Sequence, residues 1–254
     1  MDSALSIVIP VYNSEQSLTP LVERLEPVLQ SMQLTGYELI FINDGSKDGS
    51  WSVVEKLVAA RPWIRGINLM RNYGQHNALL CGIRAARFPI IVTMDDDLQH
   101  PPEEMPKLLE ALTDQVDVVY GTPKKEQHSF WRNKASVATK MALQSAMGSS
   151  IARQVSAYRV FRTHLRDAFA DYSNPHVFLD ALLAQSTKRF AALPVRHEPR
   201  SLGKSNYTFG KLVRHAINMI TGFSQAPHRL SSTQRLTQTP TYVVRSEIGR
   251  ELKQ

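Results

Sequence analysis

The feature that most constrains the fold is a regular alternation of short apolar runs with stretches of helical periodicity. Apolar, largely β-branched runs occupy residues 5–11, 37–42, 64–70, 89–94 and 116–120, at lengths typical of buried strands. Helices are predicted after Ser14, where apolar residues recur from 18 to 28, and over residues 48–60, 74–86 and 101–112. This alternation, with strands apolar along their length, predicts an α/β fold with a mostly parallel central sheet covered on both faces.

The alternation weakens in the second half of the chain. Helices are predicted over residues 131–147 and 175–184, and strands over 155–161 and 190–195. A polar, basic loop at 196–207 follows. We expect a single domain over residues 1–230. The polar tail at 231–254 is expected to be loosely packed, with a short helix near its end.

The composition favours an anionic partner. Among 254 residues, 30 Lys and Arg exceed 23 Asp and Glu, which gives a net charge of +7 and suits nucleotides, phosphorylated substrates or an acidic membrane surface. The positive charge is spread along the chain without a recognised module, so nucleic acid is not an expected partner. The single Cys81 excludes an intrachain disulfide and fits a reducing cytosol.

Membrane insertion is not expected, although membrane contact remains open. We see no signal peptide and no apolar window of about 18 residues, so no transmembrane helix is predicted. Residues 209–223 form an amphipathic pattern with Lys211, Arg214 and His215 among apolar side chains. Such a helix could lie on a membrane surface or pack on the protein's own core, and the sequence does not decide between them.

Polar residues gather where three predicted strands end. Ligands of open parallel sheets bind beyond the carboxyl ends of the strands. No glycine-rich phosphate loop follows the first strand, so neither a dinucleotide fold nor a P-loop is supported. The polar strand ends are Tyr12-Asn13-Ser14-Glu15, Asn43-Asp44-Gly45-Ser46 and Asp95-Asp96-Asp97.

Three adjacent aspartates repel one another and require compensation. An Asp-x-Asp pair at a strand end suits Mg²⁺ or Mn²⁺, and Gln99 adds a neutral oxygen. Alternatively, Asp97 caps the next helix and the others are solvated. Asp44 likewise has an alternative role in an ordinary turn. We expect His100 to support such a site rather than to bind the metal.

These strand ends resemble those of one enzyme family. "SIVIPVYNSEQSL", "YELIFINDGSKDGS", "RNYGQHNALLCGI" and "MDDDLQHPPEE" are similar to motifs of family-2 inverting glycosyltransferases with the A-type nucleotide-sugar fold, which is Rossmann-like. The subgroup is that of dolichyl-phosphate mannose synthase and bacterial polyprenyl-phosphate glycosyltransferases. The resemblance extends over residues 5–230, and "EPRSLGKSNYTFGKL" matches the stretch of the subgroup that lies near the phosphates.

The resemblance implies a role for each matched position. It implies a nucleotide-binding half over residues 1–122 and an acceptor half over 123–230. The implied nucleotide-binding residues are Pro10, Tyr12, Glu15, Asp44, Arg71, Gln75, Asp95 and Asp96. Asp95, Asp97 and Gln99 would hold Mg²⁺ or Mn²⁺, with Asp97 also catalytic. The implied phosphate- and acceptor-binding residues are Arg159, Arg200, Lys204 and Tyr207.

Three departures from the family pattern stand out. Relatives often carry Gly-Asp-Phe-Arg where this chain has Ser156-Ala157-Tyr158-Arg159. Relatives often have an arginine just after the fifth strand, where this chain has Pro123-Lys124. Many continue into transmembrane helices after a stretch like residues 227–230, where a polar tail follows here.

The sequence therefore predicts a metal-dependent transferase that moves a sugar from a UDP- or GDP-linked donor to a polyprenyl phosphate. A phosphate monoester is already largely dianionic, with a second pKa of about 6, so it needs cationic guidance such as Arg159 rather than a base. A soluble hydroxyl acceptor would need a base. Asp180 is the best candidate, although it could equally be an exposed helix residue or a helix-cap partner.

A third interpretation is a non-catalytic protein that binds nucleotide sugars. The expected location is the cytoplasm, with peripheral binding to the cytoplasmic membrane face as an option. A membrane surface and a second copy of the chain are further candidate partners.

Overall fold

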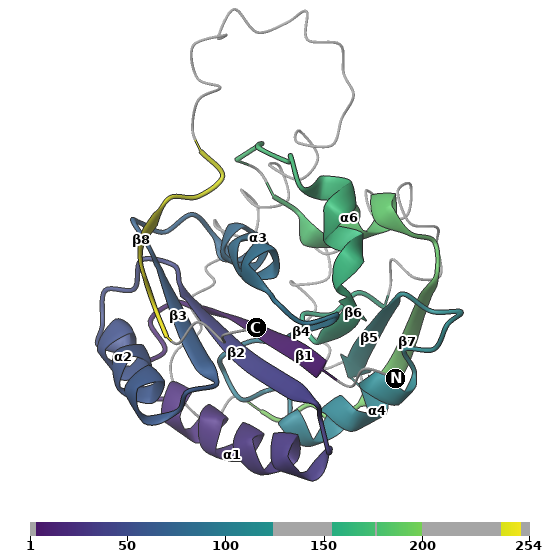
Figure 1. Ribbon diagram of the computed structural model, residues 1–254, viewed down its shortest axis with the longest axis horizontal. Coiled ribbons are helices and arrows are strands. Elements are labelled where there is room, and N and C mark those ends of the chain that lie inside the picture. Colours follow the sequence, from purple (N-terminus) through teal and green to yellow (C-terminus); the bar gives the residue numbers. More distant parts are fainter. Residues whose placement is uncertain (1–3, 124–153, 176, 200–239, 250–254) are drawn as a thin grey trace, which may run out of the picture.

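The computed structural model describes residues 4–123, 154–175, 177–199 and 240–249. In this part of the chain, eight strands form one sheet in the order β7-β5-β6-β4-β1-β2-β3-β8 (Figure 1). Six strands run in one direction, and β6 and β8 run against them. The predicted α/β class and mostly parallel sheet are confirmed.

The elements that were predicted within the described residues appear in the predicted order, with η2 and β8 in addition. The strands are β1 (Ala4–Val11), β2 (Gly36–Asn43), β3 (Ile64–Leu69), β4 (Ile90–Thr93), β5 (Val118–Pro123), β6 (Arg159–Arg162), β7 (Phe190–Val195) and β8 (Val244–Ile248). The helices are α1 (Leu18–Ser31), α2 (Ser50–Ala60), α3 (Gln75–Ala85), η1 (Pro102–Glu104), α4 (Met105–Glu110), η2 (Thr163–Phe169) and α6 (Leu179–Ser186).

Helices cover both faces of the sheet, as its apolar strands require. In Figure 1, α1, α2 and α4 lie on one side, and α3 and α6 lie on the other. Two buried apolar clusters fill the two interfaces. Helix α3 approaches β1 and β2 closely at Gly82, where an added Cβ would lie 2.4 Å from Val8 and 2.5 Å from Ile42. A glycine is needed there to let the helix approach the strands.

Strand β1 lies at the centre of the sheet, between β2 and β4. All eight residues of β1 are buried. It pairs with β2 along its whole length but with β4 only from Leu5 to Val8. The stretch that contains Pro10 therefore has β2 as its described strand partner, which is where a residue without an N–H is tolerated. Since β1 lies between β2 and β4, its carboxyl end is the point where the strand order reverses, which is the usual ligand site of such sheets.

The C-terminal tail differs from the prediction. We expected loose packing and a short helix, but residues 244–248 form β8, which pairs antiparallel with β3 at the sheet edge. Ahead of β8, the Met70 N–H donates to the Val243 carbonyl, and the Asn77 side chain donates to the Thr241 carbonyl. The expectation was wrong for residues 240–249, because pairing with β8 satisfies the backbone N–H and C=O groups at the edge of β3, which would otherwise lack a strand partner.

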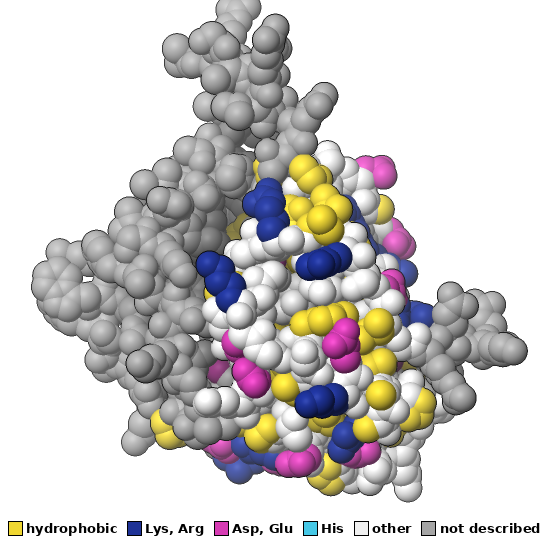
Figure 2. Space-filling model, turned by 90° about the vertical axis from the view of Figure 1, so that its left-hand side faces the viewer, with side chains coloured by type: hydrophobic (Ala, Val, Ile, Leu, Met, Phe, Trp, Pro, Cys, Tyr) yellow, Lys and Arg dark blue, Asp and Glu magenta, His cyan; other side chains and the backbone are white. Residues whose placement is uncertain are grey.

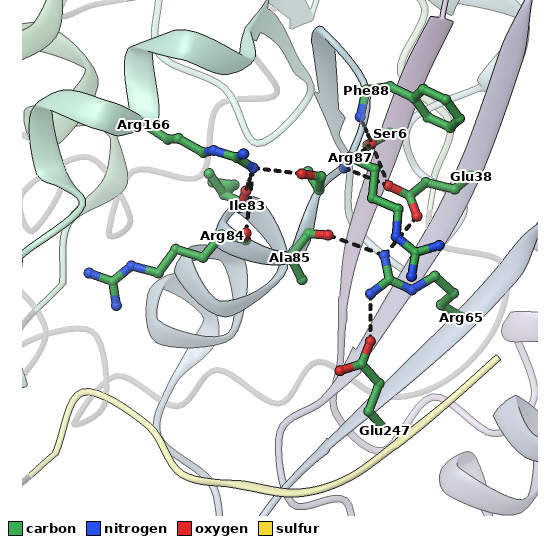
Figure 3. A network of polar contacts seen from close by, with 11 residues as sticks. Ser6, Glu38, Arg65, Ile83, Arg84, Ala85, Arg87, Phe88, Arg166 and Glu247 are labelled. Atoms are coloured by element: carbon green, nitrogen blue, oxygen red, sulfur yellow. Dashed lines mark hydrogen bonds and ion pairs between the residues drawn. The ribbon is translucent and has the colours of Figure 1, made fainter. Parts of the chain in front are cut away.

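A buried ion network connects β8 to the inner strands. Arg65 is 6% exposed and donates 2.8 Å to Glu38 on β2 and also to Glu247 on β8 (Figure 3). Glu38 accepts further hydrogen bonds from the Ser6 hydroxyl and the Arg87 N–H. One arginine between two carboxylates thus compensates the charge of Glu38, which is buried beneath α3.

Two neighbouring arginines hold helix ends against each other. The Arg166 guanidinium donates to the carbonyls of Ile83, Arg84 and Ala86 at the end of α3 (Figure 3). Arg84 in turn donates to the carbonyls of Phe169, Ala170 and Tyr172 after η2. Each cation satisfies carbonyls that a helix leaves unpaired at its C-terminus.

Other boundaries shift without changing the architecture. The predicted helix over 101–112 is divided into η1 and α4, and the predicted strand over 155–161 begins later, as β6. The predicted helices over 131–147 and 209–223 lie outside the described residues. Among the described residues, no helix has the length and apolar character needed to cross a bilayer.

Candidate active site

The loops after β1 and β2 interlock at the carboxyl edge of the sheet. The Asn13 N–H donates to the Ser46 hydroxyl at 3.0 Å, and the Lys47 N–H donates back to the Asn13 side chain at 2.8 Å. Asn13 has a φ of 55°, a left-handed conformation that asparagine tolerates better than most residues. Sequence reasoning did not single out Asn13, although an asparagine directly after a buried strand is a local signal for such a turn.

Glu15 and Asp48 fasten the same two loops at their outer side. The Glu15 carboxylate accepts the Gly49 N–H at 3.0 Å, and the Asp48 carboxylate accepts the Glu15 N–H at 3.2 Å. Glu15, implied as a nucleotide-binding residue, is therefore engaged in shaping the loop, and it is exposed. Its position beside Tyr12 and Pro10 keeps all three at the end of β1.

Asp44 organises the loop that leads into α3. It is 2% exposed, and its two carboxylate oxygens accept the backbone N–H groups of Tyr73 and Gly74 at 2.6 and 2.8 Å. Burial raises the pKa of Asp44, while these hydrogen bonds and the charge of Arg71 act in the opposite direction. Arg71 is exposed and lies over the Tyr73 ring at 4.3 Å. Asp44 thus connects the end of β2 to the predicted nucleotide-binding residues Arg71 and Gln75.

The three aspartates after β4 contact three different partners. Asp95 accepts the Gln75 side-chain amide at 2.7 Å. Asp96 accepts the Tyr12 N–H at 3.3 Å. Asp97 accepts the Gln99 N–H at 3.1 Å. Burial raises the pKa of Asp96 to about 7; the Asp95 and Asp97 charges add to this, and hydrogen bonds from Ser14 and Tyr12 oppose it. The structure therefore brings Tyr12, Gln75 and the acidic triplet together, as predicted.

The turn between Asp97 and Gln99 has an unusual backbone. Leu98 adopts a φ of 63° although it is not a glycine, and such outliers in branched residues concentrate at functional sites. After this turn His100 is buried, and burial lowers its pKa to about 4. Within the described part of the chain its Nδ1 has no hydrogen-bond partner. His100 packs against Tyr158 and His197, as expected of a supporting residue.

The acidic turn offers oxygen donors suited to a substrate-bridging cation. Among the described residues, no group of three His, Cys, Asp or Glu side chains lies close enough to form a protein-only metal site. Mg²⁺ and Mn²⁺ in phosphate-binding sites are held by one or two carboxylates, with substrate phosphates completing the shell. The carboxylates of Asp95 and Asp97 with the amide oxygen of Gln99 fit that donor set.

A buried cluster lies beside the acidic turn, on the α6 side of the sheet. Strand β6 places Arg159 in register with Thr93 of β4 and Tyr120 of β5. The Arg159 guanidinium lies 3.4 Å from the Asp180 carboxylate, and the Tyr120 hydroxyl donates to the same oxygen at 3.0 Å. All three side chains are at most 3% exposed.

The cluster changes the interpretation of Asp180. The alternative interpretation of Asp180 as an exposed helix residue is wrong, because Asp180 lies in the first turn of α6 and is only 2% exposed. Its role as a general base stays a prediction. Burial raises the pKa of Asp180, while the Arg159 charge and the Tyr120 hydroxyl lower it. Tyr120 was not predicted as part of the site. The other predicted acceptor residues, Arg200, Lys204 and Tyr207, lie outside the described residues.

The comparison with known families decides the identity. The family model described as glycosyl transferase family 2 matches residues 6–170, which include the ends of β1, β2 and β4 and the Arg159 position. The chain belongs to glycosyl transferase family 2. It is therefore a glycosyltransferase, and the resemblance drawn from its motifs is confirmed.

Curated relatives of this glycosyltransferase align along most of the chain. An undecaprenyl-phosphate 4-deoxy-4-formamido-L-arabinose transferase of Aeromonas hydrophila subsp. hydrophila is 34% identical over 229 residues, which cover 90% of this chain and 70% of the relative. The protein of the same name from Proteus mirabilis has the same identity and coverage.

Solved structures share the fold of this glycosyltransferase at low identity. Glucosyl-3-phosphoglycerate synthase from Mycobacterium tuberculosis, in complex with Mn²⁺, UDP-glucose and phosphoglyceric acid, has a TM-score of 0.60 and 16% identity and covers 85% of this chain and 77% of that chain. Mannosyl-3-phosphoglycerate synthase from Rubrobacter xylanophilus has a TM-score of 0.62 and 13% identity, with 86% and 72% covered. The expected A-type glycosyltransferase fold is confirmed.

Proposed function

We propose that this glycosyltransferase moves a sugar, with inversion, from a nucleotide-diphosphate donor to a polyprenyl phosphate. The single observation that carries the acceptor class is the 34% identity over 90% of the chain to transferases named for undecaprenyl phosphate. The donor class is supported by the motifs at the ends of β1, β2 and β4 and by the fold shared with a complex that contains UDP-glucose.

The donor would lie across the carboxyl ends of β1 and β4. The base and ribose would contact Pro10, Tyr12, Glu15 and Asp44, with Arg71 and Gln75 beside them, and the diphosphate would approach Asp95, Asp96 and Asp97. A bound Mg²⁺ or Mn²⁺ would neutralise charge on the diphosphate. Asp95, Asp97 and Gln99 are the residues of this chain that would hold it.

The acceptor phosphate would attack the anomeric carbon of the sugar. The new bond joins a phosphate oxygen to that carbon, while the bond from carbon to the nucleotide diphosphate breaks and its electron pair leaves with the diphosphate. No proton has to be removed, since the acceptor is largely a dianion at neutral pH. Arg200, Lys204 and Tyr207 would bind the acceptor phosphate, because an arginine side chain is suited to hold two phosphate oxygens.

Arg159 would contribute positive charge from beneath the reacting groups. Its Nη1 is buried, faces the Asp180 carboxylate at 3.4 Å, and has no hydrogen-bond partner among the residues that the structure describes. An unsatisfied buried donor is costly and therefore calls for a functional explanation. A positive group fixed beside the acidic turn would offset repulsion between the two phosphorylated substrates.

A second function uses a hydroxyl acceptor with Asp180 as general base. The direction of the shift favours it, since burial raises the pKa of Asp180 and so makes this carboxylate a better proton acceptor than an ordinary aspartate. Its 2% exposure and its ion pair with Arg159 argue against direct contact with an acceptor. We therefore rank this function second.

A comparison of acceptors tests the proposal. Purified protein with Mn²⁺ and a panel of UDP- and GDP-linked sugars would be given undecaprenyl phosphate or the phosphate-free alcohol undecaprenol. We expect a glycolipid product with undecaprenyl phosphate and no product with undecaprenol. Turnover of the alcohol, with none of the phosphate, would overturn the proposed acceptor and favour the second function.

A further inference from the structure

The end of β7 and the residues that follow it, 196–199, run along the acidic turn and η1. The Glu198 N–H donates to the Gln99 carbonyl at 3.0 Å. The Arg196 guanidinium donates to Glu104 at 2.6 Å, and the Lys107 ammonium donates to the Pro194 carbonyl at 2.6 Å. These contacts hold the end of β7 and the connecting segment, residues 196–199, directly against the residues that follow Asp97.

Arg24 on α1 contacts both η1 and the connecting segment. Its guanidinium donates twice to Glu103 of η1, at 3.0 and 2.8 Å, and twice to Glu198 of the connecting segment, at 2.8 and 3.0 Å. Such bidentate pairs fix orientation as well as distance. Hydrogen bonds from Arg24 lower the pKa of Glu198, so this carboxylate is charged at neutral pH.

The connecting segment is followed immediately by Arg200, the first of the proposed acceptor-phosphate residues. We infer that Arg24 is a positioning residue that fixes the connecting segment against the acidic turn and so sets where the acceptor-binding stretch begins relative to the metal-binding oxygens. This inference rests on the proposed function. Arg24 acts through Glu103 and Glu198 and has no assigned contact with substrate.

Simple stabilisation is a weak explanation for so many contacts at one side chain. Arg24, Glu103 and Glu198 are 32%, 39% and 40% exposed, so solvent screening discounts the contribution to stability even of this bidentate network. A double bidentate contact mainly fixes the distance and orientation of Glu103 and Glu198 relative to each other. A misplaced substrate group can cost far more in rate than such a contact contributes to folding.

Arg24→Ala tests the inference, with Arg61→Ala as the matched control. Arg61 pairs with Glu26 at 2.9 Å at comparable exposure and connects α1 to the end of α2 instead. In Arg24→Ala we expect kcat/KM for undecaprenyl phosphate to fall about tenfold, while the dissociation constant of the nucleotide diphosphate with Mn²⁺ changes less than about twofold. Arg61→Ala should leave both values unchanged, and Arg24→Lys should recover part of the loss.

Hydrogen exchange and a double variant separate positioning from folding. The Glu198 backbone N–H should exchange faster in Arg24→Ala. Adding Glu198→Ala to Arg24→Ala should lower kcat/KM little further, because both substitutions remove the same contact between Arg24 and Glu198. Unchanged acceptor kinetics in Arg24→Ala, or equal losses in Arg61→Ala, would overturn the inference. An inactive wild type would instead count against the proposed function, and exchange would still report whether Arg24 holds the segment.

Discussion

At the scale of single residues, the site tolerates three adjacent aspartates because their carboxylates turn to different partners. Asp95 contacts α3 through Gln75, Asp96 contacts the backbone after β1, and Asp97 closes its own turn. A strand end usually offers one or two such partners. Here α3, β1 and the Leu98 turn converge, which makes a concentrated negative charge compatible with a stable fold.

Asp44→Ala should impair donor binding more than chemistry. The substitution removes two hydrogen bonds to the Tyr73 and Gly74 N–H groups, so the loop that carries Arg71 and Gln75 loses its anchor. We expect KM for the nucleotide sugar to rise about tenfold with little change in kcat, as for lost uniform binding. Steady-state kinetics decide this, and an unchanged KM with a collapsed kcat would place Asp44 at the reacting centre.

Asp180→Asn should destabilise the protein. From sequence alone, a helix residue that is not a base would be expected to tolerate this change, but the structure shows a buried ion pair with Arg159. Breaking such a pair costs roughly 3–5 kcal/mol, whereas Tyr120→Phe, which removes one hydrogen bond to the same oxygen, should cost about 1 kcal/mol.

Urea unfolding measures both variants at Asp180 and Tyr120. Equal stability of Asp180→Asn and wild type would contradict the buried pair. If Asp180→Asn stays folded and loses turnover of an alcohol acceptor only, the second candidate function gains support.

At the scale of elements, the part of the fold that local pattern determines was predictable, and the part that depends on distant pairing was not. Strands β1 to β5 were predicted because an apolar run between turn residues is a local signal. β8 was not, since its burial pattern is almost wholly exposed and its hydrogen-bond partners lie on β3, far away in sequence.

The candidate site divides in the same way. Tyr12, Gln75 and the aspartates were found from motifs that follow the predicted strands. The carboxyl ends of parallel strands meet at one edge of the sheet, so such motifs can be expected to lie together. The roles of Asn13 and Ser46 were not predicted, because they consist of a contact between two loops. Tyr120 escaped because it meets Asp180 only once β5 and α6 pack together.

Removal of the C-terminal strand should destabilise the sheet. A chain ending at residue 239 lacks β8, so it loses the pairing with β3, the Glu247 partner of Arg65 and the Thr241 carbonyl that accepts from Asn77. We expect the free energy of unfolding to fall by ~2 kcal/mol or more, because buried polar groups lose their partners. An unpaired β3 edge should also promote aggregation.

The matched control ends at residue 249 and keeps β8. It should melt within a few degrees of the full chain. Equal melting temperatures for the chains ending at 239 and 249 would show that β8 contributes little.

Figure 2 shows this side of the molecule, and the exposed large apolar side chains of the described residues, Met70, Val243 and Val244, belong to β8 and the residues beside it.

At the scale of the whole molecule, a net charge of +7 and the proposed lipid acceptor lead us to expect electrostatic contact with an acidic membrane. Each basic residue near an anionic surface contributes about 1 kcal/mol, and salt screens it. We expect the protein to sediment with vesicles that contain anionic lipid at low salt, and to be released at high salt. Binding that is equal to neutral vesicles and insensitive to salt would contradict this.

The central claim is that the acidic turn after β4 holds a cation on the donor diphosphate during transfer to a polyprenyl phosphate. Asp97 is the key side chain, and Asp114, whose side chain is 92% exposed in a surface ion pair with Arg162, supplies the matched control. Asparagine keeps the size of either residue but removes the charge.

The most direct measurement is transfer of labelled sugar to undecaprenyl phosphate during a Mn²⁺ titration of wild type, Asp97→Asn and Asp114→Asn. We predict that chelator abolishes wild-type transfer and that Mn²⁺ restores it. Asp114→Asn should follow the wild-type curve, and Asp97→Asn should stay at least about a hundredfold slower at saturating Mn²⁺ while melting like the wild type. Wild-type rates in Asp97→Asn, or full transfer in chelator, would contradict the account.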